Sequence, residues 1–348
     1  MSDLILFIIV LGTLLLGHEL GHFIAARWRG VKIDEFGIGF PPRILTLFEA
    51  GGTKYTLNWI PLGGFVRPTG EDDPDIPGGL AASSKTTRAL VLLAGPAANV
   101  ILAFLAFQVA FRFAAPNLDQ VIIAEVTPDT PAFDAGFMEG DRVVDVSGIQ
   151  VDSFQTIQTE ILAGIGEELA ITLEREGEIV LLLVEPRTEW PEDEGPLGVT
   201  LGYPLAEMSW GDATRMALDS MQAQVVGLLR LPGRLLAGEA TQDEARVSGL
   251  KGIHDMLAWA SAVDRSSERP FITLNIVGVI SLGLALANLL PIPALDGGRL
   301  MFVFIEALLG RRISPKFEGF AHAIGFTFLL ILMVYFNLQD FINPIALP

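Results

Sequence analysis

Four long apolar runs are the feature of this sequence that most restricts its fold. They cover residues 4–26, 89–111, 271–290 and 320–336, and each has roughly the 17–25 residues that a helix needs to cross a bilayer. The first run could be a signal peptide, but its only early charge is Asp3 and no small-residue cleavage site follows. We therefore interpret it as a retained helix. The sequence predicts a multi-span α-helical membrane protein with about four transmembrane helices.

A strongly acidic segment separates the second run from the third. Residues 119–207 contain 20 Asp and Glu and only three Arg, so they carry −17 of the chain's net charge of −18. Such a segment must face water, and nucleic acid is not expected as a partner. Short apolar runs and one helical pattern near 154–162 predict a small α+β domain here. Its expected strands are residues 121–126, 142–146, 169–173 and 179–184.

Lysine and arginine flank the apolar runs asymmetrically. By the positive-inside rule, the ends that carry these residues lie in the cytoplasm. The acidic domain and both chain termini are then expected outside it. The residues that favour this orientation are Arg27, Arg29, Lys32, Lys85, Arg88, Arg299, Arg311, Arg312 and Lys316.

Two other segments have recognisable patterns. Residues 53–66 alternate weakly, and residues 60–65 carry a proline and two glycines typical of a tight turn into a second short strand. A β-hairpin is thus predicted within 53–70, on the cytoplasmic side, either in water or dipping into the membrane. Residues 216–236 are apolar with scattered arginines and an interrupting Pro232, which predicts amphipathic helices on the membrane surface.

The first apolar run contains the sequence His18-Glu19-Leu20-Gly21-His22. In a helix, residues four apart share a face with their Cβ atoms about 6 Å apart, so two imidazoles can bind one metal ion. The chain has no cysteine, so the remaining ligands must be nitrogen or oxygen, and zinc accepts both. Glu19 could then take a proton from the attacking water.

The alternative is that these are ordinary polar residues on a helix. An ionisable group at the centre of a membrane helix costs about 2.5–3.5 kcal/mol, and three stand together here. The membrane context therefore favours a functional site.

A catalytic zinc needs a third protein ligand, which must come from another span at the same depth. His18 lies about 12 Å from the inner end of its run, so the inner end of the third run is the expected source. There Pro291 and Pro293 break the helix, which only a protein-lined, wet cavity tolerates, and Asp296 supplies a carboxylate. Taken alone, Asp296 could be a turn residue before two glycines. Together with the histidines it is the predicted third ligand.

These residues resemble the site-2 protease family of intramembrane zinc metalloproteases, in its bacterial regulator-of-sigma-E form with a single PDZ domain. The resemblance covers nearly the whole chain, and the acidic segment resembles a circularly permuted bacterial PDZ domain. Beyond residues 18–22, the motifs that carry the resemblance are Asn288 with the run 291–298, then residues 36–40, 61–66, 95–99, 135–137, 140–141 and 197–199.

The resemblance implies a role for each matching residue. His18, His22 and Asp296 would bind Zn²⁺, and Glu19 would act as the general base. Asn288 would contact the substrate or the transition state. Gly63, Gly64 and Pro291 would also bind the substrate. An unwound substrate segment would pair as an added strand with the hairpin around Gly63 and Gly64.

The resemblance also implies an organisation and a location. An N-terminal membrane domain (1–117) would precede a PDZ-like domain (118–203), an amphipathic linker region (204–268) and a C-terminal membrane domain (269–348). The protein would lie in the bacterial inner membrane, with the PDZ-like domain extracytoplasmic and the active site toward the cytoplasm. Its partners would be the lipid bilayer and the transmembrane proteins or peptides it cuts in regulated intramembrane proteolysis, such as anti-sigma factors or signal-peptide remnants.

Two other classes of protein are compatible with parts of the pattern. A catalytically silent membrane PDZ adaptor would bind no zinc, and the intact motif at residues 18–22 argues against it. A metal transporter would need polar residues along its whole path, but the run 89–111 offers only Gly95, Asn99 and Gln108.

Overall fold

The computed structural model describes residues 2–117, 119–191, 194–239, 246–267 and 269–345. The chain forms two compact units, one of residues 1–112 with 209–348 and one of residues 113–208. The first unit holds the candidate site.

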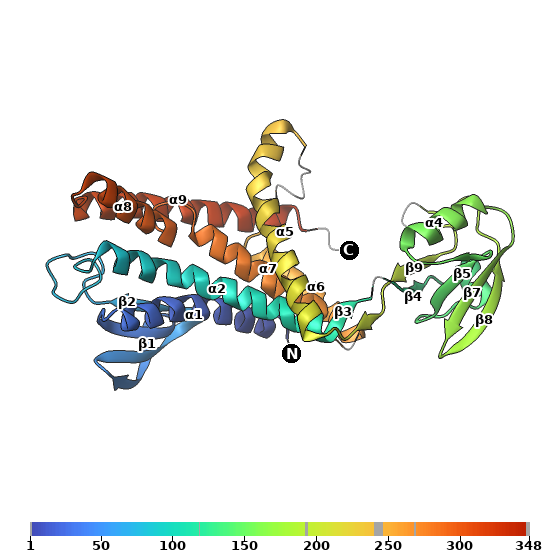
Figure 1. Cartoon of the computed structure of the whole chain (residues 1–348), viewed down its shortest axis with the longest axis horizontal. Helices are drawn as coiled ribbons and strands as arrows, with labels where there is room; N and C mark the ends of the chain where they lie inside the picture. The colour runs from blue at the N-terminus through green and yellow to red at the C-terminus, as the bar shows by residue number, and fades with distance from the viewer. Residues whose placement is uncertain (1, 118, 192–193, 240–245, 268, 346–348) are drawn as a thin grey trace. The chain divides into compact units, whose positions relative to one another are not determined.

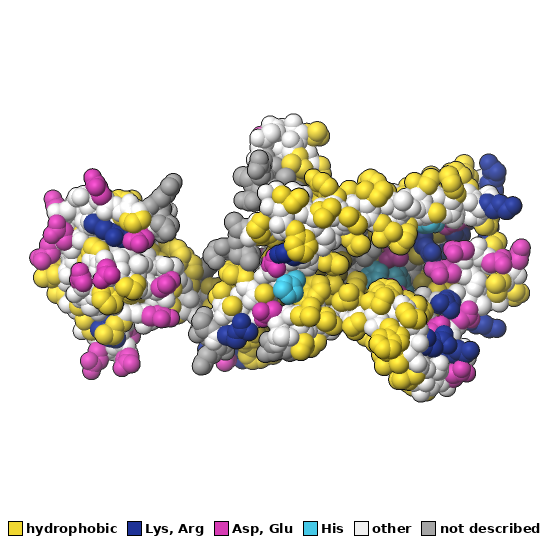
Figure 2. All heavy atoms as spheres, turned by 180° about the vertical axis from the view of Figure 1, so that it is seen from behind, with side chains coloured by type: hydrophobic (Ala, Val, Ile, Leu, Met, Phe, Trp, Pro, Cys, Tyr) yellow, Lys and Arg dark blue, Asp and Glu magenta, His cyan; other side chains and the backbone are white. Residues whose placement is uncertain are grey.

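Among the described residues of the first unit, four helices are long and apolar enough to cross a membrane, as the sequence predicts. They are α1 (Asp3–Trp28), α2 (Lys85–Ala114), α7 (Phe271–Asn288) and α9 (Pro315–Ile342). Helices α1 and α7 run in one direction and α2 and α9 in the other (Figure 1). Few side chains of α9 are buried, and apolar side chains cover much of the surface of this unit (Figure 2). Such a surface suits lipid rather than water.

Small residues bring α1 and α2 into close contact beside the candidate site. A Cβ atom added at Gly21 would lie 2.3 Å from the backbone oxygen of Ala94, and one at Gly17 would lie 2.5 Å from a methyl group of Leu102. Both glycines therefore permit a backbone approach that a larger residue would prevent. This approach brings α2 against the face of α1 that carries the histidines.

The β-hairpin differs from the sequence prediction. Strand β1 (Ile33–Ala50) pairs antiparallel with β2 (Thr53–Pro68), and the connecting turn is Gly51-Gly52, where both residues have positive φ. The predicted pairing of the strands before and after residues 60–65 was wrong, because both pair with β1 instead. The predicted change of direction at residues 60–65 is present, since residues 54–57 and 64–67 pair with the same residues 35–38 in opposite directions. Strand β1 was not predicted, since its glycines and prolines are weak strand signals.

The change in the direction of β2 at residues 60–65 depends on a glycine. Gly63 has a φ of 77°, which suits glycine. Residues 35–38 of β1 are consequently paired both with residues 64–67 and with residues 54–57 of β2. The bend lies where β2 meets α1.

Three more helices complete the first unit. Helix α8 (Asp296–Leu309) lies between α7 and α9, while α5 (Trp210–Ala237) and α6 (Leu250–Ser267) precede α7. Helix α5 continues through Pro232, so the predicted interruption was wrong. The buried carboxylate of Asp340 on α9 accepts bonds from the backbone N–H groups of Gly249 and Gly252, and thereby caps the start of α6.

The second unit is a small α+β fold, as predicted. Its six-stranded sheet has the strand order 178–184, 169–175, 142–146, 121–126 and 199–202, with residues 149–150 paired to residues 142–146. Helix α4 (Phe154–Ala163) packs Ile157 and Ile161 into a single apolar core. Acidic side chains are spread over the visible surface (Figure 2).

The predicted strands of the second unit all form, and several short elements were not predicted. The elements are β3 (Ala115–Pro116), β4 (Val121–Val126), α3 (Pro131–Ala135), β5 (Arg142–Val146), β6 (Ile149–Gln150), β7 (Leu169–Arg175), β8 (Glu178–Val184), β9 (Val199–Gly202) and β10 (Leu205–Ala206).

Glu35 connects the strands of the hairpin and makes its stability depend on pH. Its buried carboxylate accepts bonds from Thr56, Arg43 and Arg67. Burial would raise the pKa of Glu35, but hydrogen bonds from Thr56 and Arg43 and the two positive charges hold the pKa below its ordinary value. A lowered carboxylate pKa stabilises the fold above the unfolded pKa of about 4.3, and this stabilisation is lost as pH falls through the folded pKa.

We expect hydrogen exchange within residues 33–68, corrected for intrinsic rates, to show this dependence. Protection should be constant from about pH 7 to 5 and fall below about pH 4. In Glu35→Gln, protection should be lower at neutral pH and should vary less with pH, while the exposed control Glu49→Gln should behave like the wild type. Identical pH profiles for wild type and Glu35→Gln would contradict this role.

Candidate metal centre

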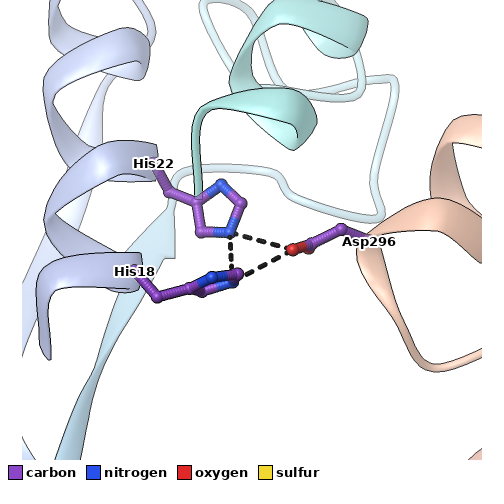
Figure 3. A group of neighbouring side chains, drawn as sticks. All are labelled: His18, His22 and Asp296. Carbon is purple, nitrogen blue, oxygen red and sulfur yellow. Dashed lines mark hydrogen bonds and ion pairs between the residues drawn. The ribbon is translucent and has the colours of Figure 1, made fainter. Parts of the chain in front are cut away.

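Three side chains from two helices meet at one point in the membrane unit. His18 and His22 lie one turn apart on α1, and Asp296 is the first residue of α8 (Figure 3). Atom Nε2 of His18 lies 3.0 Å from Oδ2 of Asp296 and 3.1 Å from Nε2 of His22. Nε2 of His22 lies 3.3 Å from the same carboxylate oxygen. The rings are nearly perpendicular, at 83°, and the Nε2 atoms of both face each other and the Asp296 carboxylate (Figure 3).

The other nitrogen of each ring has its own partner. Nδ1 of His22 lies 2.7 Å from the backbone oxygen of Val91 on α2. Because a carbonyl only accepts, a proton must be on Nδ1 of His22, and in the neutral ring Nε2 then presents a lone pair. Nδ1 of His18 lies 3.3 Å from Nδ2 of buried Asn99, whose Oδ1 has no hydrogen-bond partner among the described residues. Turning the amide over would place Oδ1 against Nδ1 and put the His18 proton there, which is how metal-binding histidines are oriented.

The spacing of the three ligand atoms fits a zinc ion. Bonds of about 2.0–2.1 Å to a tetrahedral ion place neighbouring ligands about 3.3 Å apart. The three separations of 3.0, 3.1 and 3.3 Å are close to that value. Two imidazole nitrogens and one carboxylate oxygen also match the ligand types that zinc accepts, with a fourth position left for water or substrate.

Gly95 of α2 leaves room for an ion at this point. A Cβ atom at residue 95 would lie 2.3 Å from Nε2 of His22 and 2.7 Å from Nε2 of His18. Any side chain here would occupy the space between the two ligand nitrogens. Gly95 and Asn99 of α2 both face the histidines, a placement that the sequence did not predict.

Two glycines after Asp296 let the chain fold back on itself. A Cβ atom at Gly297 would lie 2.3 Å from the backbone oxygens of Leu289 and Leu290, and one at Gly298 would lie 2.2 Å from that of Ile292. The loop between α7 and α8 is thus packed directly on the start of α8. This packing helps to hold Asp296 in place opposite α1.

A cavity of about 280 Å³ opens beside the three ligands. Its lining includes Glu19 and Asn288, together with Phe65 and Val66 of β2. One carboxylate oxygen of Glu19 accepts a bond of 3.1 Å from the backbone N–H of Val66. Figure 2 shows histidine side chains inside a hollow of the otherwise apolar surface.

Three other predicted site residues lie differently. Gly63 and Gly64 pack β2 against Leu15 and Leu16 of α1, and their neighbours Phe65 and Val66 are the ones that line the cavity. Pro291 is exposed on the loop between α7 and α8. None of the three is among the described residues that line this cavity.

Several residues around the site were not predicted from the sequence to belong to it. Arg299 lies one turn after Asp296, lines the same cavity and forms ion pairs with Glu71 and Asp72. Asn99 had been noted only as one of few polar residues in its run. The sequence signal that could have identified Asn99 is a polar side-chain amide within an apolar membrane helix.

A metal-ligand group and a carboxylate enclosed by apolar helices define a membrane-embedded metallohydrolase. Residues 6–332 match peptidase family M50. Proteins of Brucella suis and Rhizobium meliloti, both provisionally named zinc metalloproteases, are 32% and 30% identical to this chain, over 97% and 96% of it and 95% of each relative. Zinc metalloprotease RasP of Geobacillus kaustophilus is 28% identical over 98% of both chains.

The chain therefore belongs to peptidase family M50, the site-2 protease family, and is a multi-pass intramembrane zinc metalloprotease. Membership of this family argues against the two other classes considered, a silent membrane adaptor and a metal transporter.

The space at residue 95 gives a direct test of the centre. In Gly95→Ala, the new methyl group would occupy the position between the two Nε2 atoms, so we expect zinc affinity to fall by about tenfold or more. Zinc per chain, measured by elemental analysis of the purified protein after dialysis against a chelator, reports this loss. Gly283→Ala on α7 is the matched control, because a Cβ atom there meets open space. Full zinc retention in Gly95→Ala would mean that the ion is held elsewhere.

Proposed function

We propose that this protein hydrolyses peptide bonds within or next to transmembrane segments of other membrane proteins, with zinc held by His18, His22 and Asp296. The observation that carries the proposal is the convergence of these three ligand atoms at zinc spacing beside Glu19. The apolar helices around them indicate that the substrate also comes from the membrane.

The proposed reaction assigns a role to each group around the cavity. Bound zinc would supply a Lewis acid that activates water and polarises the scissile carbonyl. Glu19 takes the proton from the attacking water and returns it to the leaving amine. The Val66 N–H holds one oxygen of Glu19, which leaves the other oxygen for proton transfer. Asn288 lines the same cavity and is proposed to donate a hydrogen bond to the substrate carbonyl.

A helical substrate must unwind before its peptide bond can be attacked. All its backbone groups are satisfied within the helix, and lipid provides no alternative partners. Strand β2 offers alternative partners for the backbone of the unwound segment, because Phe65 and Val66 line the cavity at the end of the hairpin. We propose that the unwound segment lies along this part of β2 as an added strand. Gly63 and Gly64 serve this arrangement by seating β2 on α1.

The location of the site and the identity of the second unit are part of the proposal. Lys and Arg side chains gather at the end of the membrane unit formed by α8 and the hairpin (Figure 2). By the positive-inside rule this end is cytoplasmic, in a bacterial inner membrane. The second unit is proposed to be an extracytoplasmic PDZ-like domain. An apolar groove of about 480 Å³ between α4 and β9 supports this assignment.

Separating zinc binding from proton transfer tests the mechanism. We expect Glu19→Gln to keep its zinc and lose about 10²–10⁴-fold in kcat, because the amide cannot accept the proton. His22→Ala and Asp296→Ala should lose zinc and activity together. The assay uses purified enzyme with a single-span membrane protein, elemental analysis for zinc and mass spectrometry for products. The control is Glu49→Gln, an exposed glutamate of the hairpin. A fully active Glu19→Gln enzyme would exclude Glu19 as the base.

Substrate unwinding can be tested with a matched pair of substrates. A Gly-Gly pair at the scissile position costs a helix about 2 kcal/mol relative to alanine, so we expect kcat/KM to be about tenfold higher or more than with Ala-Ala. Short water-soluble peptides with the same two sequences are the control, because they have no stable helix to unwind. Equal rates for the two membrane substrates would argue against rate-limiting unwinding.

A further inference from the structure

The loop that carries Asp296 holds one residue in an unfavourable backbone conformation. Ala294, two residues before the carboxylate, has a φ of 83°, a region that residues other than glycine rarely adopt. Ala294 also lines the cavity beside the three ligands. Such a conformation persists only where the surrounding structure enforces it. The loop itself closes a turn around Ala294 with a bond of 3.1 Å from the Leu295 N–H to the backbone oxygen of Ile292, and a contact from outside the loop adds a second constraint.

Helix α9 supplies that contact through His322. The backbone N–H of Ala294 donates a bond of 2.7 Å to Nδ1 of His322. Since Nδ1 accepts, the ring proton is on Nε2, which lies 3.8 Å from a carboxylate oxygen of Glu318 one turn earlier. The ring of Phe302 on α8 packs at an angle against His322, with centroids 5.5 Å apart. The imidazole is thus fixed between α8 and the loop.

A second contact fixes the neighbouring residue of the loop. Gly325 lies one turn after His322 on the same face of α9, and a Cβ atom there would lie 2.1 Å from the backbone oxygen of Pro293. The helix backbone therefore packs directly on Pro293, while His322 binds Ala294. Most of the apolar surface of α9 is exposed, so the face that carries His322 and Gly325 makes one of the few close contacts of this helix.

We propose that His322 is a positioning residue for the metal centre. By accepting the Ala294 N–H, it holds the loop in the conformation that places the Asp296 carboxylate opposite His18 and His22. The inference rests on the proposed role of Asp296 as a zinc ligand. It gives α9 a function in the active site, although no side chain of α9 is among the described residues that line the cavity.

Two substitutions at residue 322 separate hydrogen bonding from packing. His322→Phe keeps a planar ring of similar size and removes the acceptor, whereas His322→Asn keeps an acceptor oxygen close to the position of Nδ1. We expect the phenylalanine variant to bind zinc about 10–100-fold more weakly, as for other groups that orient metal ligands. The asparagine variant should recover most of this affinity. Titration of the zinc-loaded, detergent-purified protein with a chelator measures the shift.

The absorption bands of the Co²⁺-substituted protein give a readout that stability alone would not move. They should change in His322→Phe and return toward the wild type in His322→Asn, because they report the ligand geometry. If the phenylalanine variant does not fold, His322→Leu takes its place. Equal zinc affinity in the wild type and the variant without an acceptor, or an asparagine variant no better than that variant, would overturn the proposal.

Ala294→Gly provides an independent check of the mechanism. Glycine adopts positive φ as readily as negative φ, so the loop then depends less on the hydrogen bond. The loss of zinc affinity caused by His322→Phe should be smaller in the Ala294→Gly background, and an undiminished loss would contradict the proposal. Asp296→Ala tests the underlying site separately, because unchanged zinc binding there would refute the ligand assignment whatever residue 322 does.

Discussion

The structure depends on satisfying polar groups that the membrane cannot solvate. An imidazole or carboxylate surrounded by hydrocarbon has no water to bond, so each must find a partner within the protein. Here His22 uses the Val91 carbonyl, His18 uses the Asn99 amide and Glu19 uses the Val66 N–H. These partners come from α2 and β2, which explains why a site based on α1 needs both elements around it. The Nε2 atoms of the two histidines and the Asp296 carboxylate are left facing one another. A bound cation would compensate for the repulsion between their lone pairs.

Close backbone contacts make this convergence possible. Gly21 lets α2 approach α1, and Gly95 then leaves the space that a metal ion needs. Gly297 and Gly298 allow the loop after α7 to pack on the start of α8. At each of these positions a methyl group would collide with backbone or with a ligand atom. The glycines beside the centre therefore permit close packing, because each leaves space that a side chain would fill.

The candidate site combines closely packed ligand residues with an open cavity beside them. Its ligands are held by two helices and a tightly packed loop, while the cavity beside them is bounded by the last residues of the hairpin. Arg299 joins α8 to Glu71 and Asp72 at the same cavity, so charged groups extend from the ligands along its wall. A polar wall of this kind suits the entry of water, which hydrolysis requires.

Much of the fold and the chemistry was determined by the sequence itself. Apolar runs of membrane length fix the spans, because no other structure buries so many consecutive apolar residues. The spacing of His18 and His22 fixes their common face through the helical period, and a carboxylate after a broken helix indicated Asp296. The strands of the acidic unit followed from alternation over short distances. All of these signals are local, so they can be recognised in one segment at a time.

Only the tertiary structure decided the contacts between distant segments. Strand β1 escaped prediction because its pairing with β2, rather than its own glycine- and proline-rich sequence, makes it a strand. Helix α5 continues through Pro232 although the local signal indicated a break. The partners of the histidines on α2, and of Ala294 on α9, lie up to 81 residues away from the groups they orient. Such contacts depend on how the helices pack together, and no periodicity within a single helix encodes that packing.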